Sequence, residues 1–248
     1  MKAFLLHVFY RYGWDTRSRN WLPARLLRPV LKRARRQNQP TLLDVGCGYP
    51  GLASFLPETS VAGIDLEPPP VQARIAKFHI GSIMALPFGD SSFPVVSCID
   101  VLEHLAINDR PRAVRELVRV ASRAVLIACP HGAVARKCDD DFRRASESHA
   151  RAVPDWLNEH LQHTYPIKSV IAEQVEVACR ETGRSVRLSW WYCEPASITR
   201  LVRFFAARSE LLYAGVNVLF GLLLPLWPLP SADNSYRMVM LAELAEQV

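Results

Sequence analysis

Apolar and polar positions alternate along most of the chain in blocks that are typical of an α/β protein. Short apolar runs bounded by turn residues predict strands, and longer stretches with helical spacing predict helices at 108–121 and 168–182. Strands that alternate with helices imply a doubly wound, mostly parallel sheet. We therefore expect an α/β fold with a Rossmann-like, doubly wound sheet of about seven strands and an antiparallel last strand. The predicted strands are 41–47, 61–67, 77–82, 94–100, 124–130, 184–193 and 236–244.

The beginning of the chain differs from the rest in its charge. Residues 1–40 hold ten Lys/Arg and one acid, although the whole 248-residue chain has a formal net charge of only +6. Aromatic and leucine positions between these bases indicate an amphipathic helix, or two short ones interrupted at Pro23 and Pro29. We divide the chain into a basic amphipathic N-terminal arm, 1–39, and a domain, 40–248. Such an arm suits anionic lipid, phosphorylated substrates or nucleic acid, and a solvated helix face is the alternative.

A second unusual segment, at about 196–233, lies before the last predicted strand. From Leu211 to Ala232 it has 22 residues without a charge, which is long enough for a transmembrane helix. Its prolines, and the need for the chain to return to the same sheet, argue against a span. Arginines beside Phe204 and Phe205 favour an interfacial helix. We expect an apolar lid over the active site or an insertion into one leaflet, with a helix packed on the domain's own surface as the alternative.

Cysteines and the chain's first residues bear on the compartment. The six cysteines show no CxxC pair, so we expect small core residues in a reducing environment. The apolar start is short and lacks a small-residue cleavage site, which argues against a signal peptide. We expect a cytoplasmic protein that is peripheral on the inner face of the membrane.

The stretch 131–165 is polar and His-rich, and its pattern predicts an irregular segment. The run Asp139, Asp140 and Asp141 is typical of a solvated loop. The histidines of the stretch lack the paired spacing of a zinc site, so no metal is predicted. These histidines are His149, His160 and His163.

Candidate chemistry begins at the end of the first strand, in LLDVGCGYPG (42–51). Asp-x-Gly-x-Gly lets the backbone turn closely around a ligand, because glycine tolerates positive φ and has no Cβ. About twenty residues later Asp65 ends the second strand, where a carboxylate can accept both hydroxyls of a ribose. The segment 81–105 adds a Leu-Pro-Phe turn and a strand that ends in Asp-Val-Leu-Glu-His. Dinucleotide-binding folds also use such turns, but their third glycine opens a long helix, which 51–57 fits poorly.

In this order, the motifs between about 40 and 131 resemble the class I S-adenosylmethionine-dependent methyltransferases, especially the small-molecule branch typified by ubiquinone-biosynthesis enzymes. The resemblance implies S-adenosyl-L-methionine as cofactor. It also implies that the glycine turn shapes the methionine pocket, that Asp65 holds the ribose, that Ser82 and Ile83 flank the adenine, and that Asp100 borders the transferable methyl group. The cofactor-binding set predicted in this way is Asp44, Gly46, Cys47, Gly48, Asp65, Leu66, Ser82, Ile83 and Asp100. Two positions depart from the family pattern: Pro50 stands where a third glycine is usual, and Ser82 where an acid is usual.

Methyl transfer from a sulfonium is an in-line displacement, and a general base helps when the acceptor is a hydroxyl. His104, four residues after the fourth strand, is the first catalytic candidate, and His131, after the fifth strand, is the second. Each histidine has a structural hydrogen bond as its alternative role.

The acceptor is indicated by the sequence 100–103, Asp-Val-Leu-Glu. By family resemblance, enzymes that methylate amino groups of bases or glutamine carry Asn/Asp-Pro-Pro-aromatic there. This argues against a DNA or protein amide acceptor, and we disfavour nucleic acid as a partner. Together with the basic arm and the uncharged segment, it leads us to expect a small-molecule or lipid-linked acceptor, glycans included, that is methylated near the membrane on a hydroxyl, with carbon or nitrogen as alternative atoms. Two alternatives remain open: a non-catalytic binding protein with the same fold, and an RNA methyltransferase that uses the basic arm.

Overall fold

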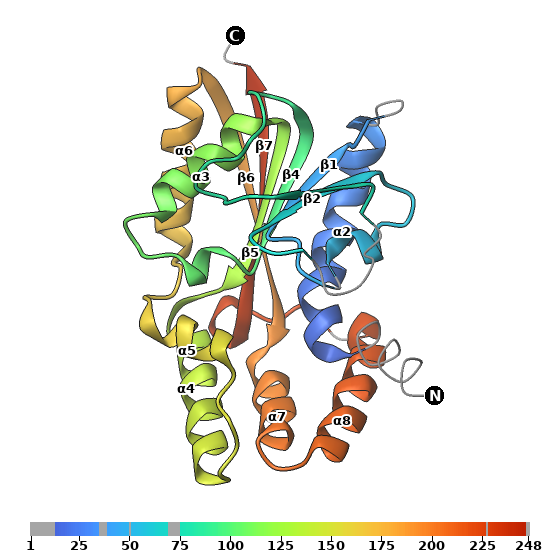
Figure 1. The fold of residues 1–248 in the computed structure, drawn as a ribbon, viewed down its shortest axis with the longest axis vertical. Helices are drawn as coiled ribbons and strands as arrows, with labels where there is room; N and C mark the ends of the chain where they lie inside the picture. Colours follow the sequence, from blue (N-terminus) through green and yellow to red (C-terminus); the bar gives the residue numbers. More distant parts are fainter. Residues whose placement is uncertain (1–12, 35–38, 50, 69–74, 227, 247–248) are drawn as a thin grey trace.

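The computed structural model describes residues 13–34, 39–49, 51–68, 75–226 and 228–246 of the chain. Its described strands form one sheet in the order β3-β2-β1-β4-β5-β7-β6 (Figure 1). Strands β1 to β5 pair in parallel, and β7 runs antiparallel to both of its neighbours. The predicted fold class is confirmed. The strands are β1 (Leu42–Val45), β2 (Val61–Asp65), β3 (Lys77–Ile80), β4 (Phe93–Ile99), β5 (Ala121–Pro130), β6 (Arg184–Pro195) and β7 (Ser235–Glu246).

Helices cover both faces of the sheet, because its central strands are apolar on both sides. Helices α3 (Arg110–Val120) and α6 (Lys168–Glu181) lie on one face, and α2 (Trp14–Ala34) lies on the other (Figure 1). Successive strand residues point to opposite faces: Leu43 packs in the core under α3 and α6, and Leu42 in the core under α2. All six cysteines are buried and free, in agreement with the predicted core role.

Helix α2 packs into the second core, so this part of the predicted basic arm lies against the sheet. Residues 1–12 and 35–38 of the arm lie outside the described residues. Leu22, Leu27 and Leu31 are buried there. The predicted interruption at Pro23 and Pro29 is wrong, since one helix continues through both. Each proline removes a backbone hydrogen bond, and we attribute the continuity of the helix to burial of its apolar side against the sheet.

The prediction of an irregular segment at 131–165 is also wrong. The structure has α4 (Gly132–Ser148) and α5 (Asp155–Gln162) there. The charged residues that resembled a loop pair along the surface of α4 at helical spacing, as in Arg136–Asp140 and Lys137–Asp141. Asp139, between them, is fully buried. Its inward position could not be read from a run of three aspartates.

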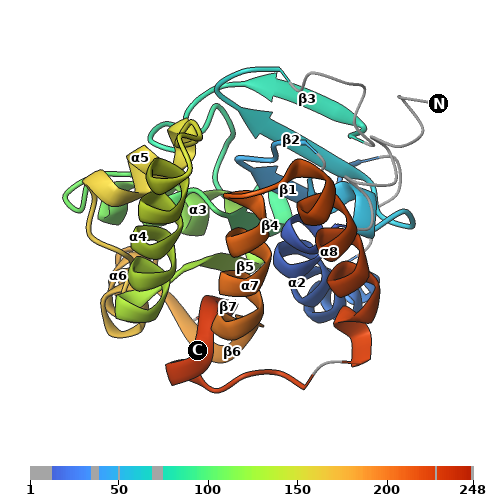
Figure 2. The same cartoon turned by 90° about the horizontal axis from the view of Figure 1, so that it is seen from below.

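The apolar segment forms two successive helices, α7 (Ala196–Ala206) and α8 (Glu210–Leu223). Together with α4 and α5 they form a cap at the end of the sheet, where α7 lies between α4 and α8, and α8 lies beside α2 (Figures 1 and 2). The side-chain oxygen of Asn217 on α8 accepts a hydrogen bond from the backbone N–H of Asp15 at 3.2 Å. Among the described helices, none combines the length and apolar character needed to cross a bilayer.

Candidate functional site

The strand order reverses at β1, which pairs with β2 on one side and β4 on the other. In open α/β sheets, ligands bind beyond the carboxyl ends of the strands at this point. A cavity of about 530 Å³, here called the first cavity, lies there. The structure places all nine predicted cofactor-binding residues on its wall, with His104 beside them. They are Asp44, Gly46, Cys47, Gly48, Asp65, Leu66, Ser82, Ile83 and Asp100.

The turn after β1 needs glycine for two different reasons. Gly46 has φ +69°, and a Cβ there would lie 2.2 Å from Cγ2 of Val101. Gly48 has φ +49°, and a Cβ there would meet nothing within 4 Å. Gly46 therefore allows close packing against Val101, whereas Gly48 leaves the backbone open toward the cavity.

Asp65 joins the end of β2 to the glycine turn. Its Oδ2 accepts a hydrogen bond from the backbone N–H of Gly48 at 2.9 Å, and its Oδ1 accepts one from that of Leu66 at 2.8 Å. An ionised carboxylate has about four acceptor sites, so each oxygen retains capacity for a ligand hydroxyl. The carboxylate is thus fixed in place before any ligand arrives.

Asp44 lies deeper, almost completely buried beneath the same turn. Its Oδ1 accepts a hydrogen bond from the Ser97 hydroxyl at 2.7 Å, and its Oδ2 accepts one from the backbone N–H of Leu52 at 3.3 Å. Burial raises the pKa of this carboxyl to about 7, since the low-dielectric surroundings disfavour its charged form.

Asp100 stands at the end of β4 in a left-handed conformation, with φ +56°. Its carboxylate forms ion pairs with Arg19 of α2, at 3.7 Å, and with Arg237 of β7. Asp100, Arg19 and His104 line both the first cavity and a second cavity of about 590 Å³. The two cavities therefore meet at these three side chains.

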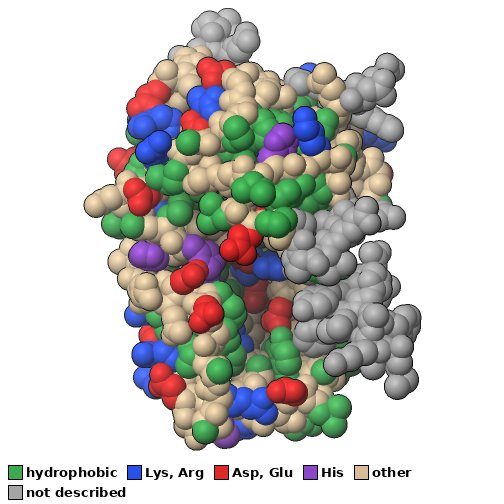
Figure 3. Space-filling model, in the orientation of Figure 1, with side chains coloured by type: hydrophobic (Ala, Val, Ile, Leu, Met, Phe, Trp, Pro, Cys, Tyr) green, Lys and Arg blue, Asp and Glu red, His purple; other side chains and the backbone are tan. Residues whose placement is uncertain are grey.

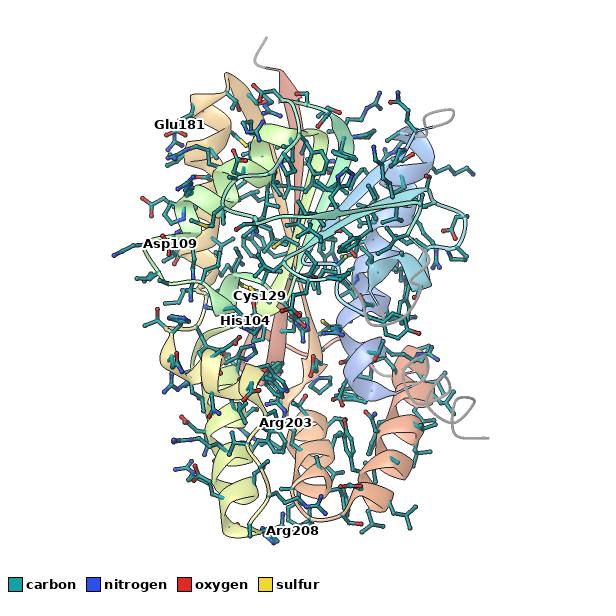
Figure 4. All side chains as sticks on the ribbon, viewed as in Figure 1. His104, Asp109, Cys129, Glu181, Arg203 and Arg208 are labelled. Atoms are coloured by element: carbon teal, nitrogen blue, oxygen red, sulfur yellow. The ribbon has the colours of Figure 1, made fainter. Side chains whose placement is uncertain are left out.

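The second cavity lies between the strand ends and the cap. Figure 3 shows a hollow on this face, with acidic and basic side chains at its floor. In Figure 4, His104 approaches from the strand ends, and Arg203 from α7. The sequence did not predict this wall, because its residues are scattered over nine helices and strands and form no motif. Its other charged and aromatic residues include Asp15, Phe142, Arg151, Trp156, His160, Glu194, Glu210, Tyr213, Tyr236 and Arg237.

A chain of polar contacts crosses the wall between His104 and the cap. Nδ1 of His104 is 2.7 Å from Oε2 of Glu159, and its Nε2 is 3.2 Å from Nε2 of His160. Nδ1 of His160 is in turn 3.1 Å from Oδ2 of Asp139. Although burial opposes ionisation of Asp139, the Arg203 guanidinium and the side-chain hydrogen bonds hold its pKa below the ordinary value. Burial, with a smaller contribution from His160, lowers the pKa of His104 and favours its neutral imidazole.

His131, the second catalytic candidate, is not brought to this place. Its ring Nε2 is 2.9 Å from the Ser235 hydroxyl, and its backbone N–H donates to the carbonyl of Tyr236 at 3.1 Å. It is outside the described lining of both cavities. Its environment is that of a structural histidine, with a pKa lowered by burial.

Comparison with known proteins bears directly on this architecture. Residues 43–129, which carry β2, β3, β4 and most of β1 and β5, match a family model described as a methyltransferase domain. Residues 43–129 thus carry a methyltransferase domain, and the match supports the predicted relation to the class I S-adenosylmethionine-dependent methyltransferases. S-adenosylmethionine is accordingly its cofactor.

Two curated methyltransferases share part of this domain. Norajmaline N-methyltransferase of Rauvolfia serpentina is 30% identical over 118 residues, which are 40% of this chain and 40% of that protein. 2-Methyl-6-phytyl-1,4-hydroquinone methyltransferase of Synechocystis is 35% identical over 91 residues, 32% of this chain and 28% of that protein. The chain thus matches less than half the length of either relative.

A solved structure extends the similarity of fold beyond the matched segment. The structure described as a putative sarcosine dimethylglycine methyltransferase from Galdieria sulphuraria has a TM-score of 0.53 at 16% identity. The superposition covers 92% of this chain and 85% of that one. The similarity of fold therefore extends over most of the chain.

The first cavity of the methyltransferase domain fits its cofactor in size and charge. Ligand pockets usually enclose about 300–1,000 Å³, and this one is within that range. Its described lining has carboxylates from four residues and a guanidinium only from Arg19, which favours a ligand that carries a sulfonium and an ammonium group. The four acidic residues are Asp44, Asp65, Asp100 and Glu159.

We predict that Asp65→Asn weakens S-adenosylmethionine binding by about 10- to 100-fold, because hydrogen bonds to a charged group contribute about 1.5–3 kcal/mol. Isothermal titration calorimetry measures the affinity. Glu67→Gln is the matched control, since it removes the same charge from an exposed position two residues away. Equal affinities for the two variants would contradict the ribose-binding role of Asp65.

A second prediction concerns pH. The pKa of Asp44 is about 7, so the carboxyl is mostly protonated below neutral pH. It must then lose its proton before it can attract a cationic ligand. Cofactor affinity should therefore fall from pH 8 to pH 6, by up to about tenfold per unit below the pKa. Calorimetry across this range tests it, with Asp44→Asn as the reference that isolates the ligand's own titration. Identical pH profiles for wild type and variant would refute the assignment.

Proposed function

We propose that the protein transfers a methyl group from S-adenosylmethionine to a hydroxyl of a small or lipid-linked acceptor, glycans included, near a membrane surface. The proposal rests chiefly on the meeting of the two cavities at Asp100, Arg19 and His104. The first cavity fits the cofactor, so the second is the place from which an acceptor can approach the transferable methyl.

The lining of the second cavity favours a polar acceptor with flat faces. Its wall carries both arginines and carboxylates, and the partly exposed Trp156 offers an aromatic surface. Aromatic rings provide large apolar contact areas, and charged fork-like guanidiniums bind several oxygens at once. A hydroxylated ring compound satisfies both kinds of group.

The cofactor, when bound, supplies an activated methyl group for in-line displacement. The chain's own residues align the acceptor and receive its proton. Neutral His104 is the first candidate for this proton, because it borders both cavities and Glu159 fixes its ring. Alignment alone is a strong effect, since well-oriented groups reach effective molarities of about 10⁵–10⁸ M.

An apolar stripe on α8 supports the membrane part of the proposal. Leu211 (84% exposed), Leu219 (54%) and Leu222 (51%) share one side of the helix, whereas Asn217 and Gly221 are buried on the other. An exposed apolar side next to basic residues is typical of interfacial helices. The same helix contributes Glu210 and Tyr213 to the second cavity. A lipid-linked acceptor could therefore enter from the surface to which α8 binds.

We expect an isotopically labelled methyl group to pass from the cofactor to hydroxyl-bearing acceptors. The variant Trp156→Ala should lower kcat/KM for the acceptor by about 10-fold or more, because it removes a large aromatic contact. Mass spectrometry of the product identifies the methylated atom. Cofactor affinity should stay unchanged, and Phe204→Ala, an exposed aromatic outside the described cavity walls, is the control. Cofactor binding without transfer to any acceptor would favour a non-catalytic role. Methylation of a nitrogen atom would contradict the proposed hydroxyl acceptor.

Liposome co-sedimentation tests the membrane contact. The triple variant Leu211→Ser, Leu219→Ser and Leu222→Ser should bind anionic vesicles several-fold more weakly than wild type, because each serine removes apolar area from the interface. Ile107→Ser with Ile167→Ser removes similarly exposed apolar side chains elsewhere and should not change binding. Equal sedimentation of all three proteins would rule out docking through α8.

A further inference from the structure

Three potential metal ligands converge where the two cavities meet. Glu103 and His104 belong to the short helix η2 (Leu102–His104), and His160 belongs to α5. One ligand atom from each residue lies within 4.8 Å of the other two. Nε2 of His160 is 3.2 Å from Nε2 of His104 and 3.8 Å from Oε1 of Glu103.

The outer hydrogen bonds of the two rings orient their lone pairs toward each other. Glu159 and Asp139 face the Nδ1 atoms of His104 and His160, and ionised carboxylates can only accept. In two neutral imidazoles each Nδ1 then carries the hydrogen, and each Nε2 presents a lone pair to the other across 3.2 Å. Two lone pairs repel at this distance unless a proton or a metal ion lies between them.

Glu103 provides an independent observation. Its side chain is 1% exposed, and neither carboxylate oxygen has a hydrogen-bond partner among the described residues. An unpaired buried carboxylate is costly, and buried acids are usually paired or bound to a metal. The imidazole Nε2 of His160 lies 3.8 Å from its Oε1, and one ligand atom of His104 lies within 4.8 Å.

We infer that Glu103, His104 and His160 form a binding site for a divalent transition-metal ion. Two histidines and one carboxylate, with a further position left open, are a common donor set for catalytic zinc and for related ions. Ligand atoms about 2.0–2.1 Å from a tetrahedral ion are about 3.3 Å apart, close to the 3.2 and 3.8 Å found here. Glu159 and Asp139 supply the outer carboxylates that metal-bound histidines usually have.

The position of the site deepens the proposed function, on which this step of the inference depends. His104 lines both cavities and His160 lines the second, so an ion held there borders the acceptor. A divalent ion lowers the pKa of a hydroxyl that binds to it. Methyl transfer then forms the O–C bond, breaks the S–C bond, leaves the electron pair on sulfur and releases the hydroxyl proton to solvent. With the ion bound, His104 serves as a ligand, and the reaction needs no histidine base.

Titration of the chelator-treated full-length protein with Co²⁺ and with Zn²⁺ tests the inference without any activity measurement. Calorimetry should give one site, and Co²⁺ should give the visible absorption of a bound ion. Glu103→Gln and His104→Gln should each weaken binding by more than about 100-fold. Glu159→Gln changes a side chain that contacts the His104 ring but is not itself a ligand, and it should weaken metal binding by about 10- to 100-fold.

His163→Gln is the matched control, because it removes a histidine from the same region that is outside the ligand group; its affinity should equal that of wild type. Absence of a one-to-one site, or equal metal affinity in wild type, Glu103→Gln and His104→Gln, would overturn the inference. Thermal melting checks that each variant is folded, and Glu159 is exposed, so its variant does not disturb the core.

Cofactor titration of the same proteins separates the two proposals. If the metal site is absent, cofactor binding is still intact.

Discussion

The parallel pairing of β1 with β2 on one side and β4 on the other is the constraint from which the site follows. It brings the carboxyl ends of three strands to one edge, so that Asp44, Asp65 and Asp100 come from distant parts of the chain yet share a cavity wall. Residues 42–45, 61–64 and 95–98 are nearly all apolar and buried, which fixes the register of these strands on both faces. The three aspartates lie at or near the strand ends, where the buried core borders the first cavity.

Buried Asp139 has a corresponding role in the cap. Its carboxylate bonds to Tyr236 of β7, Arg203 of α7, Tyr165 and His160, and so joins the cap helices to the sheet. Loss of one partner from such a buried network lowers the stability of the fold, whereas a fully satisfied network favours a single arrangement of the elements. The second cavity is enclosed by these same elements. Its shape therefore depends on one aspartate that the sequence pattern assigns to a solvated loop.

The sequence allowed the sheet and the first cavity to be predicted, because both rest on local signals: apolar runs, the glycine turn, and Asp65 at a strand end. It did not reveal the cap, since the burial of Asp139 depends on contacts with residues 21 or more positions away, such as His160, Tyr165 and Tyr236. The histidine cluster was missed for the same reason. Metal spacing was sought within one segment, whereas the ligands come from η2 and α5. The prolines at 23 and 29 also led to a wrong prediction of interrupted helices in α2, where tertiary packing outweighs local propensity.

Backbone strain supports a functional reading of the junction between the cavities. Asp100 and Glu194 both have positive φ, at +56° and +63°, and both pair with the buried Arg237. Such conformations cost about 1–3 kcal/mol for residues other than glycine and persist only where the surroundings over-determine them. Glycine at either position would relieve the strain but would remove a carboxylate from the wall of the second cavity. The two carboxylates neutralise the buried Arg237, so the strained backbone at these positions places the balancing charges at the junction of the two cavities.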